Sequence, residues 1–204
     1  MVHVDMDADG IIPQALEDMI HSLRKSGKTI KFLYTIPNFH NPAGVTLSEE
    51  RRPHIVEICQ REHVLIVEDN PYGLLGFGSD PLPALKSYAP EVVVYLGSFS
   101  KMFAPGFRIG WAYAPHAVRD KLVLASESAI LCPSMVGQMA IGGYLVRLRA
   151  LVTASVPRST PSRFHVSRAV RGMYFMPTPS SYIADRNASV IHGTEGFDLA
   201  VPVR

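Results

Sequence analysis

The stretch from Val92 to Lys101 reads Val-Val-Val-Tyr-Leu-Gly-Ser-Phe-Ser-Lys, so a β-branched apolar run leads directly into small polar residues and a lysine. A short apolar run that ends at turn residues is typical of a strand buried in a parallel sheet. In an open α/β sheet, ligands bind beyond the carboxyl ends of the strands. We therefore predict a strand over Val92–Ser98 that carries Lys101 to the ligand-binding edge of such a sheet.

Other runs of the same kind surround this stretch. Buried strands are predicted at Lys31–Pro37, His63–Asp69 and Ile109–Ala114. Helical patterns lie between and around them, at Gln14–Arg24, Leu47–Glu62, Ala117–Ser126 and Ser134–Leu151. The alternation of helices and strands predicts an α/β fold with a mainly parallel sheet and flanking helices.

The helix at Leu47–Glu62 carries two local signals. Thr46-x-x-Glu49 has the spacing of a capping box at a helix N-terminus. Pro53 falls several residues inside the predicted helix, where its ring and its missing N–H disrupt helical bonding. We therefore predict a kink at Pro53.

Composition restricts the class of protein. The 204 residues are 47% hydrophobic and 19% charged, with a formal net charge of +2, so the chain is globular, and neither nucleic acid nor an anionic membrane is expected as its partner. Cys59 and Cys132 cannot form a disulfide framework and lack the spacing of a metal site, so no metal is expected and a reducing, cytoplasmic compartment is favoured. The acidic start lacks the features of a secretory signal, and no apolar run approaches the length of a bilayer span.

The composition changes near residue 150, which divides the chain into residues 1–150 and 151–204. The second part holds six arginines, no lysine and three acidic residues, and it is rich in Ser, Thr and Pro. It shows no sustained helical or strand period. We therefore treat 151–204 as an unassigned tail.

The polar residues of the first part gather in four short segments at the predicted strand ends. The segments are Pro37-Asn-Phe-His-Asn-Pro-Ala-Gly44, Val67-Glu-Asp-Asn-Pro-Tyr-Gly73, Gly97-Ser-Phe-Ser-Lys101 and Pro105-Gly-Phe-Arg-Ile-Gly-Trp111. Asn38 is assigned to turn formation, because Asn is a common turn residue. Glu68 is expected to point away from Asp69, to the other face of its strand.

Taken in order from about Val4 to about Leu145, these segments resemble the fold type I pyridoxal phosphate enzymes and, within them, the class I and II aminotransferases. The sequences of these segments are most similar to those of the branch that contains 2-aminoadipate and related multi-substrate aminotransferases. The resemblance implies that residues 1–150 are the second half of the large, cofactor-binding domain. It also implies pyridoxal 5'-phosphate as cofactor, an amino acid and a 2-oxo acid as substrates, and a homodimer.

The resemblance assigns the reactive end of the cofactor to Lys101, as the amine that forms a Schiff base and moves the substrate α-proton. Asp69 is expected to pair with the pyridinium nitrogen. Tyr72 and Asn41 are expected to donate hydrogen bonds to the 3-oxygen, and Asn41 also to contact the substrate.

The phosphate of the cofactor is assigned to Ser98 and Arg108, a hydroxyl and a guanidinium fork that suit a dianion. Ser100 is the alternative hydroxyl. Apolar neighbours predict that Arg108 is buried, and a buried arginine requires an anion.

The resemblance also implies that the chain is truncated, since family members are roughly twice this length. The tail is expected to be either an out-of-frame reading or a diverged remnant of the small C-terminal domain. Two alternatives to an aminotransferase stay open: a non-catalytic remnant or interaction protein of the same fold, and a pyridoxal phosphate-dependent lyase.

Overall fold

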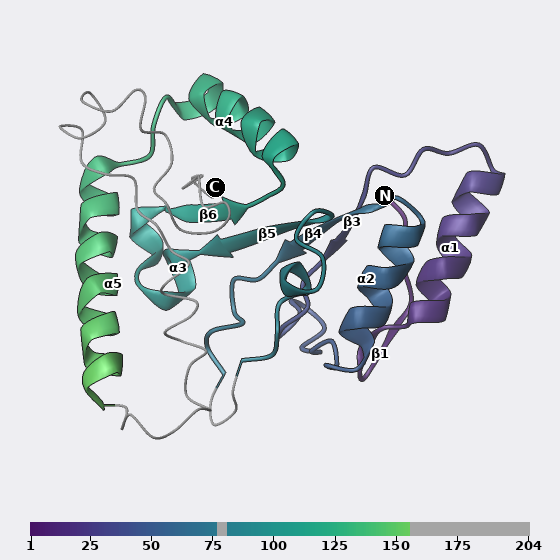
Figure 1. The fold of residues 1–204 in the computed structure, drawn as a ribbon, viewed down its shortest axis with the longest axis horizontal. Coiled ribbons are helices and arrows are strands. Elements are labelled where there is room, and N and C mark those ends of the chain that lie inside the picture. The colour runs from purple at the N-terminus through teal and green to yellow at the C-terminus, as the bar shows by residue number, and fades with distance from the viewer. Residues whose placement is uncertain (77–80, 156–204) are drawn as a thin grey trace.

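A computed structural model of the chain describes residues 1–76 and 81–155. Within them a four-stranded sheet has the order β3 (Phe32–Thr35), β4 (Leu65–Asp69), β5 (Val93–Ser98) and β6 (Gly110–Tyr113) (Figure 1). The first three strands are parallel, and β6 runs antiparallel to β5. The predicted α/β fold with a mainly parallel sheet is confirmed.

Helices flank the sheet at both ends (Figure 1). The helical elements are α1 (Pro13–Lys25), α2 (Arg51–Arg61), η1 (Leu85–Ser87), α3 (Phe99–Met102), η2 (Pro105–Phe107), α4 (His116–Ile130) and α5 (Met135–Ser155). Helix α5 continues across the change of composition at residue 150, and residues 156–204 of the predicted tail lie outside the described part. No helix of residues 1–76 and 81–155 is both long enough and apolar enough to cross a membrane.

The start of α2 differs from its prediction. The helix begins at Arg51, so Pro53 is the third helical residue and lies in the first turn, where backbone N–H groups have no intrahelical acceptor. A proline is tolerated there, and the predicted kink is wrong. The predicted capping box is wrong too, because the Thr46 hydroxyl accepts a hydrogen bond from the Phe39 backbone N–H at 3.0 Å instead.

Strand β3 lies at the edge of the four-stranded sheet and is more exposed than predicted. Phe32 and Tyr34 are each 52% exposed, whereas the alternate residue Thr35 is buried. The prediction of a buried strand is wrong here because an edge strand has only one neighbour. Strand β5, with neighbours on both sides, is buried at Val93, Val94, Gly97 and Ser98 as predicted.

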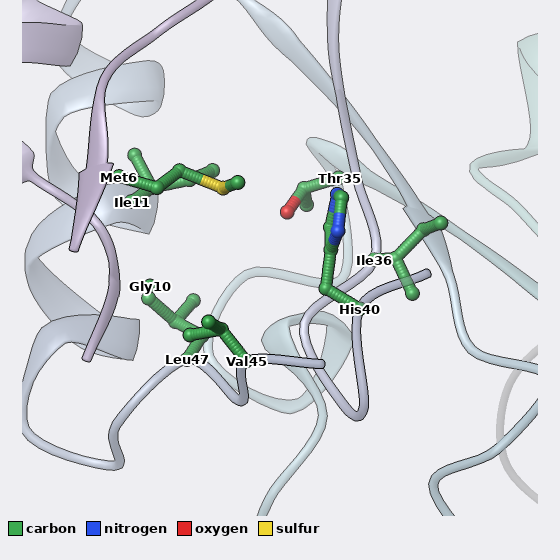
Figure 2. A pocket seen from close by; sticks show the side chains of 8 residues that line it. All are labelled: Met6, Gly10, Ile11, Thr35, Ile36, His40, Val45 and Leu47. Carbon is green, nitrogen blue, oxygen red and sulfur yellow. The ribbon is translucent and has the colours of Figure 1, made fainter. Parts of the chain in front are cut away.

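A small hairpin precedes α1 and was not predicted. Strands β1 (Met6–Asp7) and β2 (Gly10–Ile11) pair antiparallel and face the loop after β3. A cavity of about 10 Å³ lies between the hairpin and this loop. It is lined by Met6, Gly10, Ile11, Thr35, Ile36, His40, Val45 and Leu47 (Figure 2). This space suits about one water molecule and is far too small for a cofactor.

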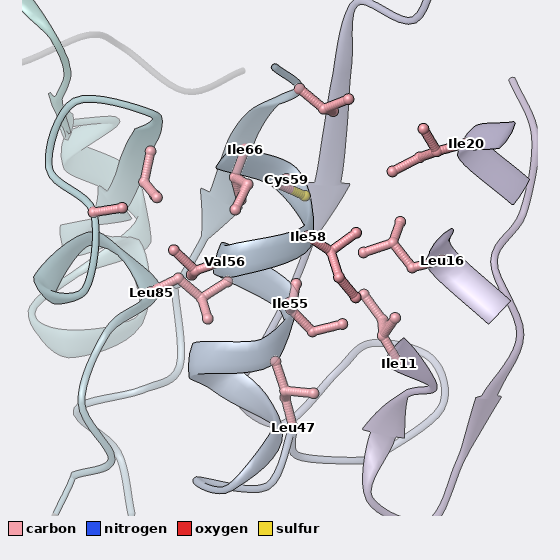
Figure 3. Close-up of a cluster of buried hydrophobic side chains, with 13 residues drawn as sticks. Ile11, Leu16, Ile20, Leu47, Ile55, Val56, Ile58, Cys59, Ile66 and Leu85 are labelled. Carbon is pink, nitrogen blue, oxygen red and sulfur yellow. The ribbon is translucent and has the colours of Figure 1, made fainter. Parts of the chain in front are cut away.

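The main core fills the space between α1, α2 and the sheet (Figure 3). Ile55 of α2 and Ile66 of β4 are fully buried, as is Leu85 of η1. Each such side chain contributes about 1.5–3 kcal/mol through burial. The core thereby fixes β4, whose carboxyl end carries Asp69.

A second cluster holds the other end of the sheet and includes Phe99, Ile109, Trp111, Ile141 and Leu145. The Trp111 ring lies across Gly97, where an added Cβ would come within 2.2 Å of the ring. The same ring packs on Phe99, with centroids 4.7 Å apart. Gly97 is therefore required by this close approach, and the packing fixes the point where β5 turns into α3.

Candidate functional site

The four polar segments meet at one edge of the sheet. Strands β3, β4 and β5 are parallel, so the residues that follow them emerge at the same edge. Because β6 is antiparallel, with Ser98 paired to Gly110, the residues before β6 also lie at this edge. This arrangement brings Arg108 to the edge although it precedes its strand.

Lys101 and Tyr72 come together at this edge. Lys101 lies in α3 directly after β5, and its side chain is exposed. Its Nζ is 5.7 Å from the centroid of the Tyr72 ring, in the turn that follows β4. An amine and a phenol from two neighbouring strand ends thus face one another.

Asp69 ends β4 and has a partner that the sequence did not reveal. The Tyr34 hydroxyl donates a hydrogen bond to Asp69 Oδ2 at 2.6 Å. Partial removal from water, and then the hydrogen bond to the carboxylate, raise the pKa of Tyr34 above its ordinary value. The phenol is therefore a protonated donor that orients the carboxylate and leaves Oδ1 for another partner.

The pattern of β3 contains a signal for Tyr34. Tyr34 pairs with Val67, two residues before Asp69. Its side chain lies on the exposed face of an edge strand, where a long phenol reaches the neighbouring strand end. The signal is a tyrosine on the exposed face of an edge strand, one strand away from the carboxylate.

The serines and Arg108 are arranged differently from the prediction. Ser98 is buried, and its Oγ caps α3 by accepting a hydrogen bond from the Ser100 N–H at 3.1 Å. The hydroxyl beside Arg108 is that of Ser100, whose Oγ lies 3.4 Å from Arg108 Nη1. The structure therefore pairs Arg108 with Ser100, the alternative hydroxyl.

The predicted burial of Arg108 is wrong. Arg108 follows η2 with φ 53° and ψ 42°, a left-handed conformation, and its side chain is exposed. The left-handed turn is the reason, because the strand and its buried pattern begin only after it, at Ile109 and Gly110. The guanidinium consequently lies over the start of α3 beside Ser100.

Asn41 lies on the loop after β3 and is exposed. The peptide bond from Asn41 to Pro42 is cis. Two short hydrogen bonds shape this loop, from the His40 N–H to the Val45 carbonyl at 2.7 Å and from the Gly44 N–H to the His40 carbonyl at 2.5 Å. The tight turn presents Asn41 at the same sheet edge as Asp69.

Comparison with known proteins shows which family the chain resembles. The model of the aminotransferase class I and II family matches residues 2–145. The chain belongs to this family. The family resemblance is therefore confirmed, together with pyridoxal phosphate as the cofactor that the family uses.

Two curated relatives and one solved structure define the likeness. The aromatic-amino-acid aminotransferase 1 of Thermococcus litoralis is 44% identical over 151 residues, which are 71% of this chain and 36% of that protein. The 2-aminoadipate transaminase of Thermus thermophilus is 31% identical over 191 residues, 84% of this chain and 47% of that protein. An archaeal alanine:glyoxylate aminotransferase structure superposes with a TM-score of 0.68 at 33% identity, covering 72% of this chain and 36% of the other.

The chain is shorter than the proteins that it matches. The chain spans between about a third and a half of the relatives that it matches. The match to the 2-aminoadipate transaminase covers 84% of this chain, which is a larger share than residues 1–150 make up. It therefore extends into the tail.

Glu68 precedes Asp69 in β4 and, unlike Asp69, is fully buried, which agrees with the prediction that the two side chains point to opposite faces of the strand. Its Oε2 accepts a hydrogen bond from the Lys86 N–H at 3.0 Å, whereas Oε1 has no partner among the described residues. Burial raises the pKa of Glu68 from 4.5 to about 7, although Arg52 and Lys86 oppose the shift. Folding thus favours the protonated carboxyl.

Replacing Glu68 with glutamine is expected to change how stability depends on pH. Between about pH 4.5 and 7 the folded chain binds more protons at Glu68 than the unfolded chain, so the free energy of unfolding falls as pH rises through this window. Glu68→Gln removes this loss. The free energy of unfolding of the variant, relative to that of the wild type, is therefore expected to rise by about 2–3 kcal/mol between about pH 4.5 and pH 7. Urea unfolding at several pH values measures the difference.

The matched control is Glu57→Gln, which makes the same chemical change at an exposed position of α2. Its unfolding free energies should run parallel to those of the wild type across the window. Parallel profiles for Glu68→Gln itself would show that Glu68 titrates normally in the folded chain.

Proposed function

We propose that this chain is part of a pyridoxal phosphate-dependent aminotransferase that moves an amino group between an amino acid and a 2-oxo acid. The observation that carries the proposal is the meeting of Lys101 with Tyr72 at the carboxyl edge of the sheet, next to Asp69. The side chains there suit the cofactor. They provide an amine, a carboxylate, a phenol, an amide, and a guanidinium with a hydroxyl. The relatives named as aminotransferases support the same reaction class.

The proposed roles follow from position and chemistry. When bound, pyridoxal phosphate supplies an electron sink for the substrate α-carbon. Lys101 would hold the cofactor at its aldehyde carbon through Nζ, the aldehyde oxygen leaving as water, and its freed amine would move the proton at the substrate α-carbon. Asp69 holds the ring nitrogen protonated, and Tyr72 and Asn41 donate to the 3-oxygen.

Arg108 binds the cofactor phosphate together with a serine hydroxyl. Ser100 lies beside the guanidinium, while Ser98 holds the helix turn from which Ser100 projects. Both serines therefore support the phosphate position, Ser100 by direct contact and Ser98 through the backbone. The Arg108 side chain is exposed, so its guanidinium is in contact with solvent at this edge.

The test is a titration of the full chain with pyridoxal phosphate, followed by visible absorption. Saturable appearance of a shifted visible band is expected. Addition of an aromatic amino acid or 2-aminoadipate to the loaded chain should then release one equivalent of the matching 2-oxo acid. Absence of a band at saturating cofactor contradicts binding by this chain, and a band without 2-oxo acid contradicts transamination.

Tyr34→Phe is expected to weaken binding of the cofactor about threefold to tenfold. The substitution removes one hydroxyl, so Asp69 loses the donor that orients its carboxylate toward the ring nitrogen. The measurement is the dissociation constant from the absorption titration.

Tyr88→Phe is the control, because Tyr88 is also exposed and lines a different surface hollow, together with Asp9 and Ser48. Its dissociation constant should equal that of the wild type. An unchanged constant for Tyr34→Phe would mean that Asp69 needs no help from Tyr34.

The setting of the protein is inferred from smaller observations. We infer a homodimer, supported by strongly exposed apolar side chains on α4 and α5, among them Leu124, Val136 and Met139. Light scattering of the purified chain tests the dimer.

The unpaired thiols Cys59 and Cys132 support a cytoplasmic location. The match that extends into the tail supports a diverged, in-frame remnant over an out-of-frame reading, at least for its first part.

A further inference from the structure

Asn38, assigned by sequence to a turn, is a buried connector between two loops. It is 4% exposed. Its Oδ1 accepts a hydrogen bond from Arg52 Nη2 at 2.7 Å, and its Nδ2 donates to Asn70 Oδ1 at 3.0 Å. One amide thus joins the loop after β3 to the turn after β4.

The direction of these bonds is fixed by chemistry. A guanidinium only donates hydrogen bonds, so the amide of Asn38 must present its oxygen to Arg52 and its nitrogen to Asn70. Asn70 Oδ1 then accepts a second bond, from the Gly73 N–H at 2.9 Å. Reversal of either amide would place two donors or two acceptors face to face.

The bond to Gly73 controls the turn that holds Tyr72. A Cβ on Gly73 would lie 2.2 Å from Asn70 Oδ1 and 2.8 Å from Asn38 Nδ2, so both amides pack directly on the glycine backbone. Tyr72 is the residue before this glycine. Its ring position beside Lys101 therefore depends on where the two asparagines hold the turn.

Arg52 anchors the other side of the connection. Its fully buried guanidinium donates to the carbonyls of Pro37 at 3.3 Å and Leu47 at 3.0 Å, the two ends of the loop that carries Asn41. The Leu47 N–H closes the same loop by donating to the Pro37 carbonyl at 2.8 Å. The Asn41 loop and the Tyr72 turn are consequently held to one buried cation.

We propose that Asn38 is a positioning residue that sets the distance between the hydrogen-bond donors Asn41 and Tyr72. The inference rests on the proposed function, in which these two side chains share the 3-oxygen of pyridoxal phosphate. Asn38 acts through Asn70 and Gly73 and does not itself touch the cofactor. Two donors that must reach one oxygen need a rigid separation, and the Arg52–Asn38–Asn70 chain provides it.

Asn38→Asp tests the connection with almost no change in volume. The new carboxylate still accepts from Arg52, but it has no donor for Asn70. We expect hydrogen exchange of the Gly73 amide, measured without cofactor, to accelerate about tenfold. We also expect pyridoxal phosphate to bind about tenfold more weakly, and the pH at which the bound cofactor's visible band changes to shift.

Gln14→Glu is the matched control, an amide-to-carboxylate change at an exposed position of α1. It should leave Gly73 exchange and cofactor affinity unaltered. Asn70→Ser provides a second variant should Asn38→Asp fold poorly, with the same expected changes.

The two arms separate the two ideas. Unchanged Gly73 exchange in Asn38→Asp and in Asn70→Ser overturns the positioning role, whether or not the cofactor binds. Faster Gly73 exchange with wild-type affinity and an unshifted band also overturns it, since the turn would move without consequence. Failure of the wild-type chain to bind pyridoxal phosphate contradicts the proposed function, while the exchange arm still decides whether Asn38 holds the turn.

Discussion

Lys101→Ala is expected to abolish the covalent label that borohydride leaves when it reduces the chain in the presence of pyridoxal phosphate. Lys101 is exposed in α3 and faces Tyr72, so its amine is available to an aldehyde at the sheet edge. Alanine is a good helix former, so folding should be undisturbed. Without the amine, proton movement at the substrate α-carbon should slow by about 10²–10⁴-fold. Peptide mapping of the reduced protein and single-turnover measurements of 2-oxo acid report the two effects.

Lys121→Ala is the control for this experiment. Lys121 is exposed too, but it lies on α4. Its removal should leave the extent and the position of labelling unchanged. A label that persists in Lys101→Ala, or that maps to several lysines in the wild type, would show that the amine at this edge is not selected by its surroundings.

Arg52→Met is expected to lower the free energy of unfolding by about 3–5 kcal/mol, the range for removing one member of a buried charged network. Burial lowers the pKa of the Arg52 guanidinium, and the charge of Glu68 opposes that shift. Its guanidinium donates to the carbonyls of Pro37, Leu47 and Pro83, and methionine has no donor to replace these bonds. Urea unfolding gives the change.

The neighbouring residue supplies the comparison. Arg51 pairs with Asp7 at 2.6 Å near the surface, and Arg51→Met should cost far less because water replaces an exposed partner. Arg52→Lys should fall between the two variants, since an ammonium keeps the charge but cannot reach several carbonyls in a fork. Equal losses for Arg51→Met and Arg52→Met would contradict a special role for the buried guanidinium.

Much of the sheet could be predicted because buried strands have a plain chemical signature. The apolar runs ending at Asp69 and Ser98 occur close to their predicted positions, and the polar residues after them share one edge. Strand β3 was harder, since an edge strand buries only one face. Its exposed face holds Tyr34, so the apolar pattern of β3 does not by itself predict the hydrogen bond from Tyr34 to Asp69.

Other features depend on contacts between residues far apart in the chain. Pro53 falls in the first turn of α2 because the helix starts late, and no local pattern marked that start. Asn38 had a sound local explanation as a turn residue, yet its neighbours are Arg52 and Asn70, 14 and 32 residues away. The direction of β6 likewise decides that Arg108 reaches Ser100.

The packing of Trp111 on Gly97 has a practical consequence. Trp111 is the single tryptophan of the 204 residues, so all indole emission of the protein comes from one buried ring. That ring is paired to the residue directly before Ser98, at the strand end that leads to Lys101. Energy transfer from one indole to a chromophore bound at Lys101 would quench its fluorescence, so the fold contains an intrinsic optical probe of site occupancy.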